Sequence, residues 1–313
     1  MRPLIGIALL IVLAVVATSP RFLRLRRATL VGALVSGGWL GVGAGALIGP
    51  DALGIVAPGD AARAAPILTI GLGWVGLMIG LQLRADILRQ VPRAVYQMQL
   101  ADAGLTLVVI GGGAAMIARF VLGFDPAQAL LVAAVLAASG LGWAAETRSL
   151  RLGASAPPEL VLALRAGAGL SAPIAVTFFG VVVAMAQPGA GLITAGLRIV
   201  ALGAVAAALG LVARFSLRRA GDSRPDFLAI LLGVVALITG AAVELRVSPL
   251  LASMMAGVVI ANLAGAELRK FERVILEAEH VVAVLYAIVA GALLDLNVSS
   301  GYLALAGAII GLR

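Results

Sequence analysis

Two apolar segments decide the fold: AVLAASGLGW at residues 134–143 and LRAGAGLSAP at residues 164–173. They belong to an apolar hairpin, residues 132–176, whose arms are long enough for two membrane helices. Both arms hold helix-weakening residues at membrane depth, and the second arm adds a full charge. These residues are Ser139, Gly140, Ser171 and Pro173, with Arg165 as the charge. Because such residues are costly in hydrocarbon, we expect two broken helices whose cost is offset by function or by a nearby partner.

The composition predicts an all-α polytopic membrane protein. Of the 313 residues, 62% are hydrophobic and only 12% are charged, and most apolar segments lack the polar face of a soluble helix. The chain has no cysteine, which excludes disulfides and cysteine-ligated metals. The sequence also lacks hydrolase and metalloprotease motifs, so we expect no enzyme activity, cofactor or metal site.

Ten apolar segments approach the roughly 20 residues that one bilayer crossing needs, and a shorter eleventh follows. We expect helices at 4–19, 28–49, 66–83, 95–118, 128–144, 158–186, 190–213, 227–243, 248–265 and 276–294, with the short one at 301–312. The longest polar gap between them, residues 214–226, has 13 residues. No soluble domain fits in such a gap.

The basic residues orient the chain because they collect in alternate loops. Sixteen of the 23 Lys and Arg residues follow odd-numbered predicted helices. They are Arg21, Arg24, Arg26, Arg27, Arg84, Arg89, Arg93, Arg148, Arg151, Arg214, Arg218, Arg219, Arg224, Arg269, Lys270 and Arg273. Since positive loops stay in the cytoplasm, we expect a multi-pass protein of the inner (plasma) membrane with its N-terminus outside. The net charge of +8 then reflects topology, and nucleic acid is not an expected partner.

An internal repeat follows from two similar pairs of segments. The third predicted helix closes with LMIGLQLR around Gly80, as the tenth closes with IVAGALLD around Gly291, and glycines before Gly49 in the second resemble the stretch before Asn262 in the ninth. The offsets, 211 and 213 residues, nearly agree, and an odd number of helices separates each pair. The pattern predicts an inverted repeat within one membrane domain, 1–313: a first repeat at about 1–187, a linker helix at 190–213 and an incomplete second repeat at 227–313.

Five motifs together carry a family resemblance: VGALVSG at 31–37, GPDALG at 49–54, GWVGLMIGLQLR at 73–84, LASMMAGVVIAN at 251–262 and EAEH at 277–280. They resemble the cation:proton antiporter superfamily, the sodium/proton exchanger-like transmembrane domain. The resemblance runs nearly end to end. It implies a homodimer in which a mobile core domain with broken helices moves against a dimerisation domain. It further implies exchange of Na⁺ or K⁺ for H⁺ in the lipid bilayer, at carboxylates on the sixth helix beside a break in the fifth.

Two departures from that family stand out. Ser139 and Gly140 fall where the fifth-helix break is expected, but the family's carboxylate pair would fall near Ser171, which cannot carry a charge. The family also has about thirteen helices, so the chain reads as truncated at its C-terminus or as a natural short relative. The alternative to an antiporter is therefore a transport-inactive relative that serves as a structural or regulatory membrane subunit.

Arg165 and Asp102 are the charged candidates for an ion or proton pathway. Arg165 follows Pro158 by seven residues and Asp102 follows Ala94 by eight, so both lie roughly 10–12 Å from the same membrane side. We expect them to form an ion pair, since either charge alone costs about 2.5–3.5 kcal/mol on insertion scales. The alternative is that Arg165 extends to the interface while Asp102 lines a wet crevice.

The remaining candidates are uncharged or peripheral. Ser171 and Pro173 offer a hydroxyl and backbone carbonyls to a cation, or else only a helix kink. His280, beside Glu277 and Glu279, suits pH sensing because histidine titrates near neutrality, or else it caps a helix or lines an interface.

Overall fold

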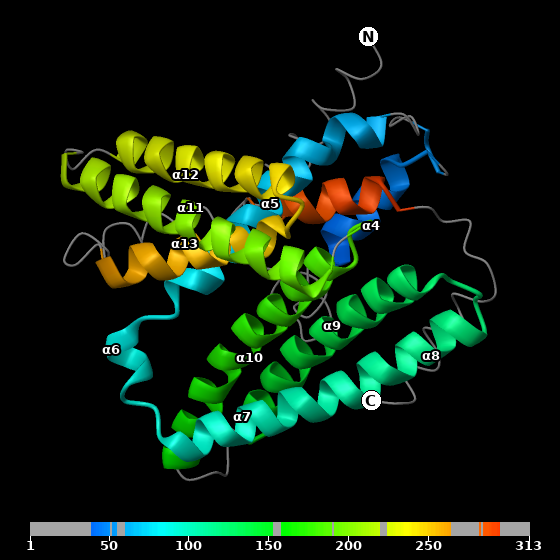
Figure 1. The fold of residues 1–313 in the computed structure, drawn as a ribbon, viewed down its shortest axis with the longest axis horizontal. Helices are drawn as coiled ribbons and strands as arrows, with labels where there is room; N and C mark the ends of the chain where they lie inside the picture. Colours follow the sequence, from blue (N-terminus) through cyan, green and yellow to red (C-terminus); the bar gives the residue numbers. More distant parts are fainter. Residues whose placement is uncertain are drawn as a thin grey trace. The chain divides into compact units, whose positions relative to one another are not determined.

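The computed structural model describes residues 39–50, 52–54, 60–152, 158–189, 191–219, 224–263, 282 and 284–294. Within these residues every regular element is a helix (Figure 1), as the composition predicts. The predicted helices at 4–19 and 301–312 lie outside the described residues.

The described helices follow the predicted segments closely, often to within a few residues. They are α4 Trp39–Ile48, α5 Asp60–Leu81, α6 Ala85–Leu88, α7 Arg93–Thr106, α8 Gly112–Phe120, α9 Pro126–Leu152, α10 Pro158–Met185, α11 Leu192–Arg219, α12 Arg224–Glu244 and α13 Pro249–Leu263. Residues 284–292 form a further helix. The short α6 is the one that hydropathy did not indicate, because its four residues are far too few for a bilayer crossing.

The chain forms two compact units, and α5 contributes its first part to one and its last part to the other. The first unit comprises the described parts of Met1–Trp74 and Arg269–Val298. In it, α4 packs against the helix at 284–292 through glycines. A Cβ added to Gly45 would lie 2.9 Å from the Cα of Gly291 and overlap the carbonyl oxygen of Ile288, and one on Gly291 would overlap that of Val42. The two backbones therefore touch where no side chain fits.

The second unit, the described parts of Val75–Leu268 with Ser299–Arg313, holds a matching contact between the end of α5 and α13. A Cβ on Gly80 would overlap the carbonyl oxygen of Met254, and one on Gly257 would lie 2.5 Å from that of Leu77.

The two contacts use residues at corresponding positions. From Gly45 to Gly257 is 212 residues, as it is from Val42 to Met254, while Gly80 to Gly291 and Leu77 to Ile288 each span 211. The two glycine-to-carbonyl approaches of one unit thus have counterparts in the other at offsets of 211 and 212 residues, close to the 211 and 213 of the sequence repeat. The packing within each unit is what two copies of one helix pair would produce.

The other helices of the second unit fall into two groups (Figure 1). In one group, α11 and α12 pack against α13 and against each other; in the other, α7 and α8 pack against α9, and α7 and α9 against α10. Small residues allow close packing, since Ala114, Ala118, Ala137 and Ala206 are all fully buried. The contacts of α10 with α11 and α13 connect the two groups.

The expected breaks in the hairpin are absent. Both α9 and α10 run on as α-helices through Ser139 and through Pro173. The Ser139 hydroxyl donates to the carbonyl of Leu136 at 2.8 Å, so its own helix satisfies it. A proline removes a single helical hydrogen bond, and the Thr177 hydroxyl donates to the Pro173 carbonyl at 2.8 Å. The prediction of broken helices here was therefore wrong.

A departure from α geometry lies instead in the neighbouring helix. Between α7 and α8, Leu107–Gly111 form a π-helical segment, and the N–H of Gly112 reaches back to the carbonyl of Leu107. Segments of this kind hold an extra residue and often mark functional sites. This one begins five residues after Asp102.

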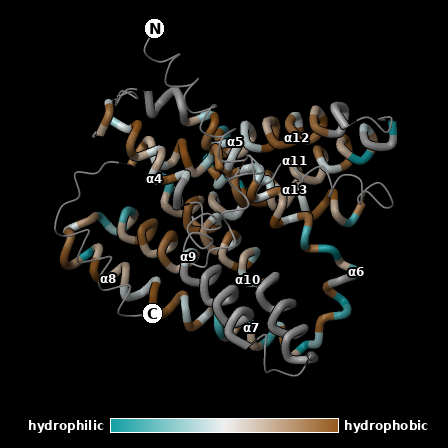
Figure 2. Tube along the Cα trace, turned by 180° about the vertical axis from the view of Figure 1, so that it is seen from behind, coloured by the Kyte–Doolittle hydropathy of each residue, from teal (hydrophilic) through white to brown (hydrophobic). Residues whose placement is uncertain are grey.

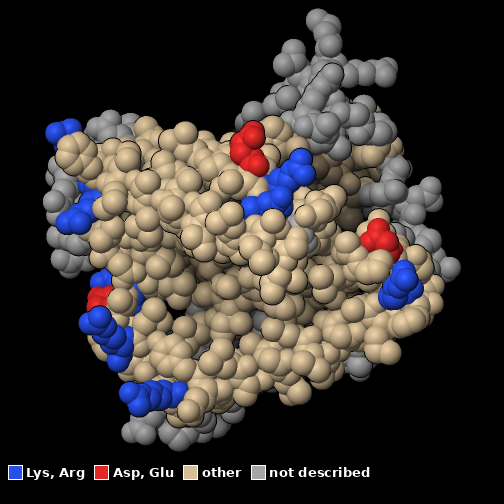
Figure 3. All heavy atoms as spheres, viewed as in Figure 1, with Lys and Arg blue, Asp and Glu red and all other residues tan. Residues whose placement is uncertain are grey.

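The lengths of the apolar helices and the largely uncharged surface are those of a membrane protein. Arg93–Phe120 and Leu192–Ser216 are long and apolar enough to span a bilayer, and five shorter apolar helices accompany them. Figure 2 shows hydrophilic residues around α6, whereas α12 and α13 are mostly hydrophobic. On the face in Figure 3, charged side chains form small groups, several along one edge, and most of the surface is uncharged.

Candidate functional site

Three polar side chains share one face of α7. Gln99, Asp102 and Thr106 are spaced three and four residues apart, which places them on successive turns of the same helix face. Gln99 is only 6% exposed, and Asp102 and Thr106 are half-buried. Of these three residues, only Asp102 was predicted from the sequence as a site residue. The helical spacing of Gln99 and Thr106 around that carboxylate was the signal that would have found the other two.

Packing brings this face of α7 beside the hairpin. Ala103, which follows Asp102, and Ala175 of α10 share a buried cluster, against which Leu107, Ala138 and Ile174 pack. The turn of α7 with the carboxylate therefore lies against the middle of α9 and α10.

The hairpin candidates lie around this cluster. Ser171 precedes Ala175 by one turn and is 2% exposed, and Pro173 is buried between them. Ser139 follows Ala138 and is exposed. Asp102, Ser139 and Pro173 are thus each next in sequence to a residue of this cluster, and Ser171 lies one turn from Ala175.

Two candidates are described only by their backbone. Arg165 lies in α10, six residues before Ser171 and hence about 9 Å along the helix. Gly140 lies inside α9. The side chain of Arg165 lies outside the described residues, so its ion pair with Asp102 stays a prediction.

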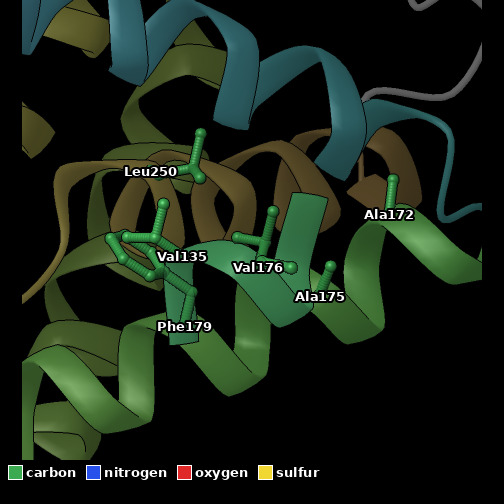
Figure 4. A pocket seen from close by; sticks show the side chains of 7 residues that line it. Val135, Ala172, Ala175, Val176, Phe179 and Leu250 are labelled. Atoms are coloured by element: carbon green, nitrogen blue, oxygen red, sulfur yellow. The ribbon is translucent and has the colours of Figure 1, made fainter. Parts of the chain in front are cut away.

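A pocket of about 310 Å³ opens next to the cluster (Figure 4). Its lining comes from α9, α10 and α13: Val135, Ala138, Ala172, Ala175, Val176, Phe179 and Leu250. None of these seven side chains carries a polar atom, so the pocket offers no side-chain ligand for a hydrated cation. The pocket leaves free space between α10 and Leu250 of α13.

The arrangement suits a proton or a monovalent cation. Among the described residues, no three of His, Cys, Asp and Glu gather as a multivalent metal site would require. One carboxylate near hydroxyl and amide oxygens is instead a low-charge set of hard oxygen ligands. His280, Glu277 and Glu279 lie outside the described residues, so pH sensing there stays a prediction.

Comparison with known proteins gives one family. The family model described as "Sodium/hydrogen exchanger, transmembrane" matches residues 8–312. This match covers almost the whole chain and confirms the resemblance drawn from the sequence motifs. No curated protein matches the chain.

Proposed function

The chain belongs to the sodium/hydrogen exchanger transmembrane family, and from this premise we propose that it exchanges Na⁺ or K⁺ for H⁺. The family is one of membrane transporters, not of enzymes. The observation that carries the proposal is the buried cluster of Ala103 and Ala175, which joins the carboxylate-bearing turn of α7 to the hairpin.

Asp102 is the proposed coupling group. Exchange requires a group that is charged when it holds the cation and neutral when it holds a proton, and the Ser171 hydroxyl cannot make that change. Asp102 is the carboxylate nearest in sequence to the buried cluster. Asp102 would take the place of the carboxylate pair that the family carries on its sixth helix and that this chain lacks there.

Neighbouring oxygens complete the proposed ion site. The Ser171 hydroxyl and the amide oxygen of Gln99 are uncharged ligands on the two packed helices. Because Pro173 has no N–H, it cannot donate to the carbonyl of Gly169, which leaves that oxygen for a cation. Arg165 is the proposed counter-ion of Asp102.

The proposed motion moves α7–α10 against α11–α13. The apolar pocket between α10 and Leu250 supports this, because helices packed at full density have no room to shift. The repeated glycine contacts further support an inverted repeat, and the family resemblance supports a homodimer. The distribution of basic residues supports the plasma membrane with the N-terminus outside.

Proteoliposomes with an imposed pH gradient test the function. The wild-type protein is expected to dissipate the gradient when Na⁺ or K⁺ is added, and Asp102→Asn is expected to reduce the rate to that of empty liposomes. Asp125→Asn is the matched control, because Asp125 is exposed and its carboxylate accepts from the N–H of Gln128 at 2.8 Å at the start of α9. If the wild type dissipates the gradient with neither cation, a transport-inactive subunit becomes the better reading. If Asp102→Asn keeps the full rate, the coupling group lies elsewhere.

A further inference from the structure

The apolar pocket beside α10 lies next to a tight helix contact. Gly180 packs directly on Leu251 of α13, since a Cβ added to Gly180 would lie 2.5 Å from Leu251 Cδ2. One to two turns earlier in α10, Ala172 and Ala175 line the pocket with methyl groups, and Ala138 of α9 adds a third (Figure 4). The two helices therefore touch at Gly180, while the small side chains beside that contact leave space unfilled.

The size and chemistry of the pocket suit a hydrocarbon ligand. Its volume of about 310 Å³ reaches the range of ligand pockets, about 300–1,000 Å³. A dry apolar cavity of about 150 Å³ already holds one benzene molecule. Because all seven lining side chains are hydrocarbon, water gains no side-chain hydrogen bond inside. Unfilled apolar space forfeits packing contacts, so an apolar occupant would stabilise this region.

The pocket opens at the depth of lipid acyl chains. Val135 lines it and is 52% exposed, so the pocket is continuous with the outer surface of α9. The start of α9 and the end of α10 lie on the same membrane side, because the two helices form a hairpin. Val135 follows Pro126 by nine residues and Phe179 precedes Met185 by six, which places both about 9–14 Å from those ends. One leaflet supplies about half of the roughly 30 Å hydrocarbon core, so its acyl chains reach this depth.

We propose that the pocket binds one acyl chain of a membrane phospholipid, which enters past Val135 and contacts Val176 and Leu250 inside. Hydrocarbon is the solvent at this depth, and lipid tails are as apolar as the lining side chains. A fluid chain can leave again, so the pocket still provides the room that the proposed motion of α7–α10 needs. The lipid site does not depend on whether the protein exchanges ions.

Photolabelling from the bilayer tests the proposal. The full chain is reconstituted in liposomes of phosphatidylcholine that carries a diazirine in one acyl chain, irradiated, digested and mapped by mass spectrometry. Adducts are expected at Val176 and Leu250, although Val176 is only 6% exposed, and at Leu197 of α11, which is 69% exposed. None is expected at the fully buried Leu202. Adducts at Leu197 without adducts at Val176 and Leu250 would overturn the proposal.

A second probe separates a lipid chain from a loose apolar molecule. Free trifluoromethylphenyldiazirine carries the same reactive group but has no headgroup. If this probe labels Val176 and Leu250 while the phospholipid does not, the pocket takes small apolar molecules and the lipid assignment fails.

Variants assign the labelling to the pocket. Ala172→Phe is expected to fill the space and to remove the adducts at Val176 and Leu250 while the adduct at Leu197 stays. Ala204→Phe is the control, because Ala204 is an exposed residue of α11 outside the pocket and the side chain grows by the same amount. Undiminished labelling of Val176 in Ala172→Phe contradicts the assignment. If that variant does not fold, Val135→Trp at the pocket mouth decides, and wild-type labelling of Leu250 in it counts against entry past Val135.

Discussion

Gly80 and Gly257 bring the backbones of α5 and α13 into direct contact. A Cβ added to Gly80 would lie 2.9 Å from the Cα of Gly257, and one added to Gly257 would lie 3.0 Å from the Cα of Gly80. Real Cβ atoms essentially never lie as close as 2.9 Å, and 3.0 Å is tighter than nine in ten of their contacts. Neither helix can shift without disturbing the other contacts of α13. The crossing therefore exists only because both positions lack a side chain.

Gly80→Ala and Gly257→Ala are expected to destabilise the protein by about 1–3 kcal/mol or more, since overpacking against backbone has no flexible atom to absorb it. The midpoint of thermal unfolding in detergent measures the effect. Gly233→Ala in α12 is the control, because nothing lies within 4 Å of its added Cβ. There the alanine removes a helix-weakening glycine and is expected to be neutral or stabilising.

The repeat extends this prediction to the first unit. Gly45→Ala and Gly291→Ala meet the same kind of obstacle and are expected to lower the unfolding midpoint by similar amounts. If Gly291→Ala leaves the unfolding midpoint unchanged while Gly80→Ala lowers it, the two contacts are not equivalent.

Asn262 ties the turn after α5 to the end of α13. Its Oδ1 accepts from the N–H of Ala85 at 2.8 Å, and its Nδ2 donates to the carbonyls of Leu83 at 3.1 Å and Val258 at 2.8 Å. Asn262→Ala is expected to speed amide hydrogen exchange at Ala85 by about tenfold, the worth of one hydrogen bond. Because Asn262 is exposed, the global unfolding midpoint is expected to change little.

Gln82→Ala is the control for this experiment. Gln82 lies in the same turn and is exposed, and among the described residues its side chain forms no hydrogen bond. Equal acceleration in both variants would mean that the turn opens independently of Asn262.

The π-helical segment predicts an unusual tolerance to deletion. Because Leu107–Gly111 hold one residue more than an α-helix would, removing Val108 lets the segment close as α while α8 keeps its buried face. Val108 is 73% exposed, so little packing is lost. The shortened protein is expected to elute as a single species on size exclusion. If the π geometry serves the site, it is expected to lose ion exchange while staying folded.

Deleting Val200 provides the comparison. Val200 is likewise exposed, at 70%, but lies in regular α-helix. Its removal turns the rest of α11 by about 100° and carries Leu202 and Ala206 out of the core. Aggregation is the expected result. Comparable damage from the two deletions would mean that the π segment does not absorb a residue.

The helices could be predicted from the sequence because a bilayer sets both their composition and their length. The segment predicted at 248–265 is α13, Pro249–Leu263, and the one at 158–186 is α10, Pro158–Met185. Composition and length could not tell whether α9 and α10 are broken or continuous. Serine, glycine and proline weaken a helix on average, but α9 and α10 continue through Ser139 and Pro173, and the Ser139 hydroxyl donates within its own helix.

The candidate site was only partly predictable for the same reason. Asp102 stands out in an apolar segment by its charge alone, whereas Gln99 becomes notable only once its burial is known. Gly111 and Gly112 did not indicate the π-helical segment in the sequence. Close packing explains such glycines equally well, and a Cβ added to Gly111 would lie 3.4 Å from the Cβ of Ala137 in α9.

The pairing of Asp102 with Arg165 is best tested by exchanging the two charges. Each lies in a helix of the packed α7–α10 pair, and each single reversal, Asp102→Arg or Arg165→Asp, puts two like charges into an apolar bundle. Breaking a buried pair costs about 3–5 kcal/mol, so both single variants are expected to express poorly. The double variant restores opposite charges and is expected to recover much of the membrane-inserted protein, measured by fluorescence-detected size exclusion. A double variant that expresses no better than either single one means that the two residues do not face each other. Arg165 then extends to the interface, and Asp102 lines a wet crevice.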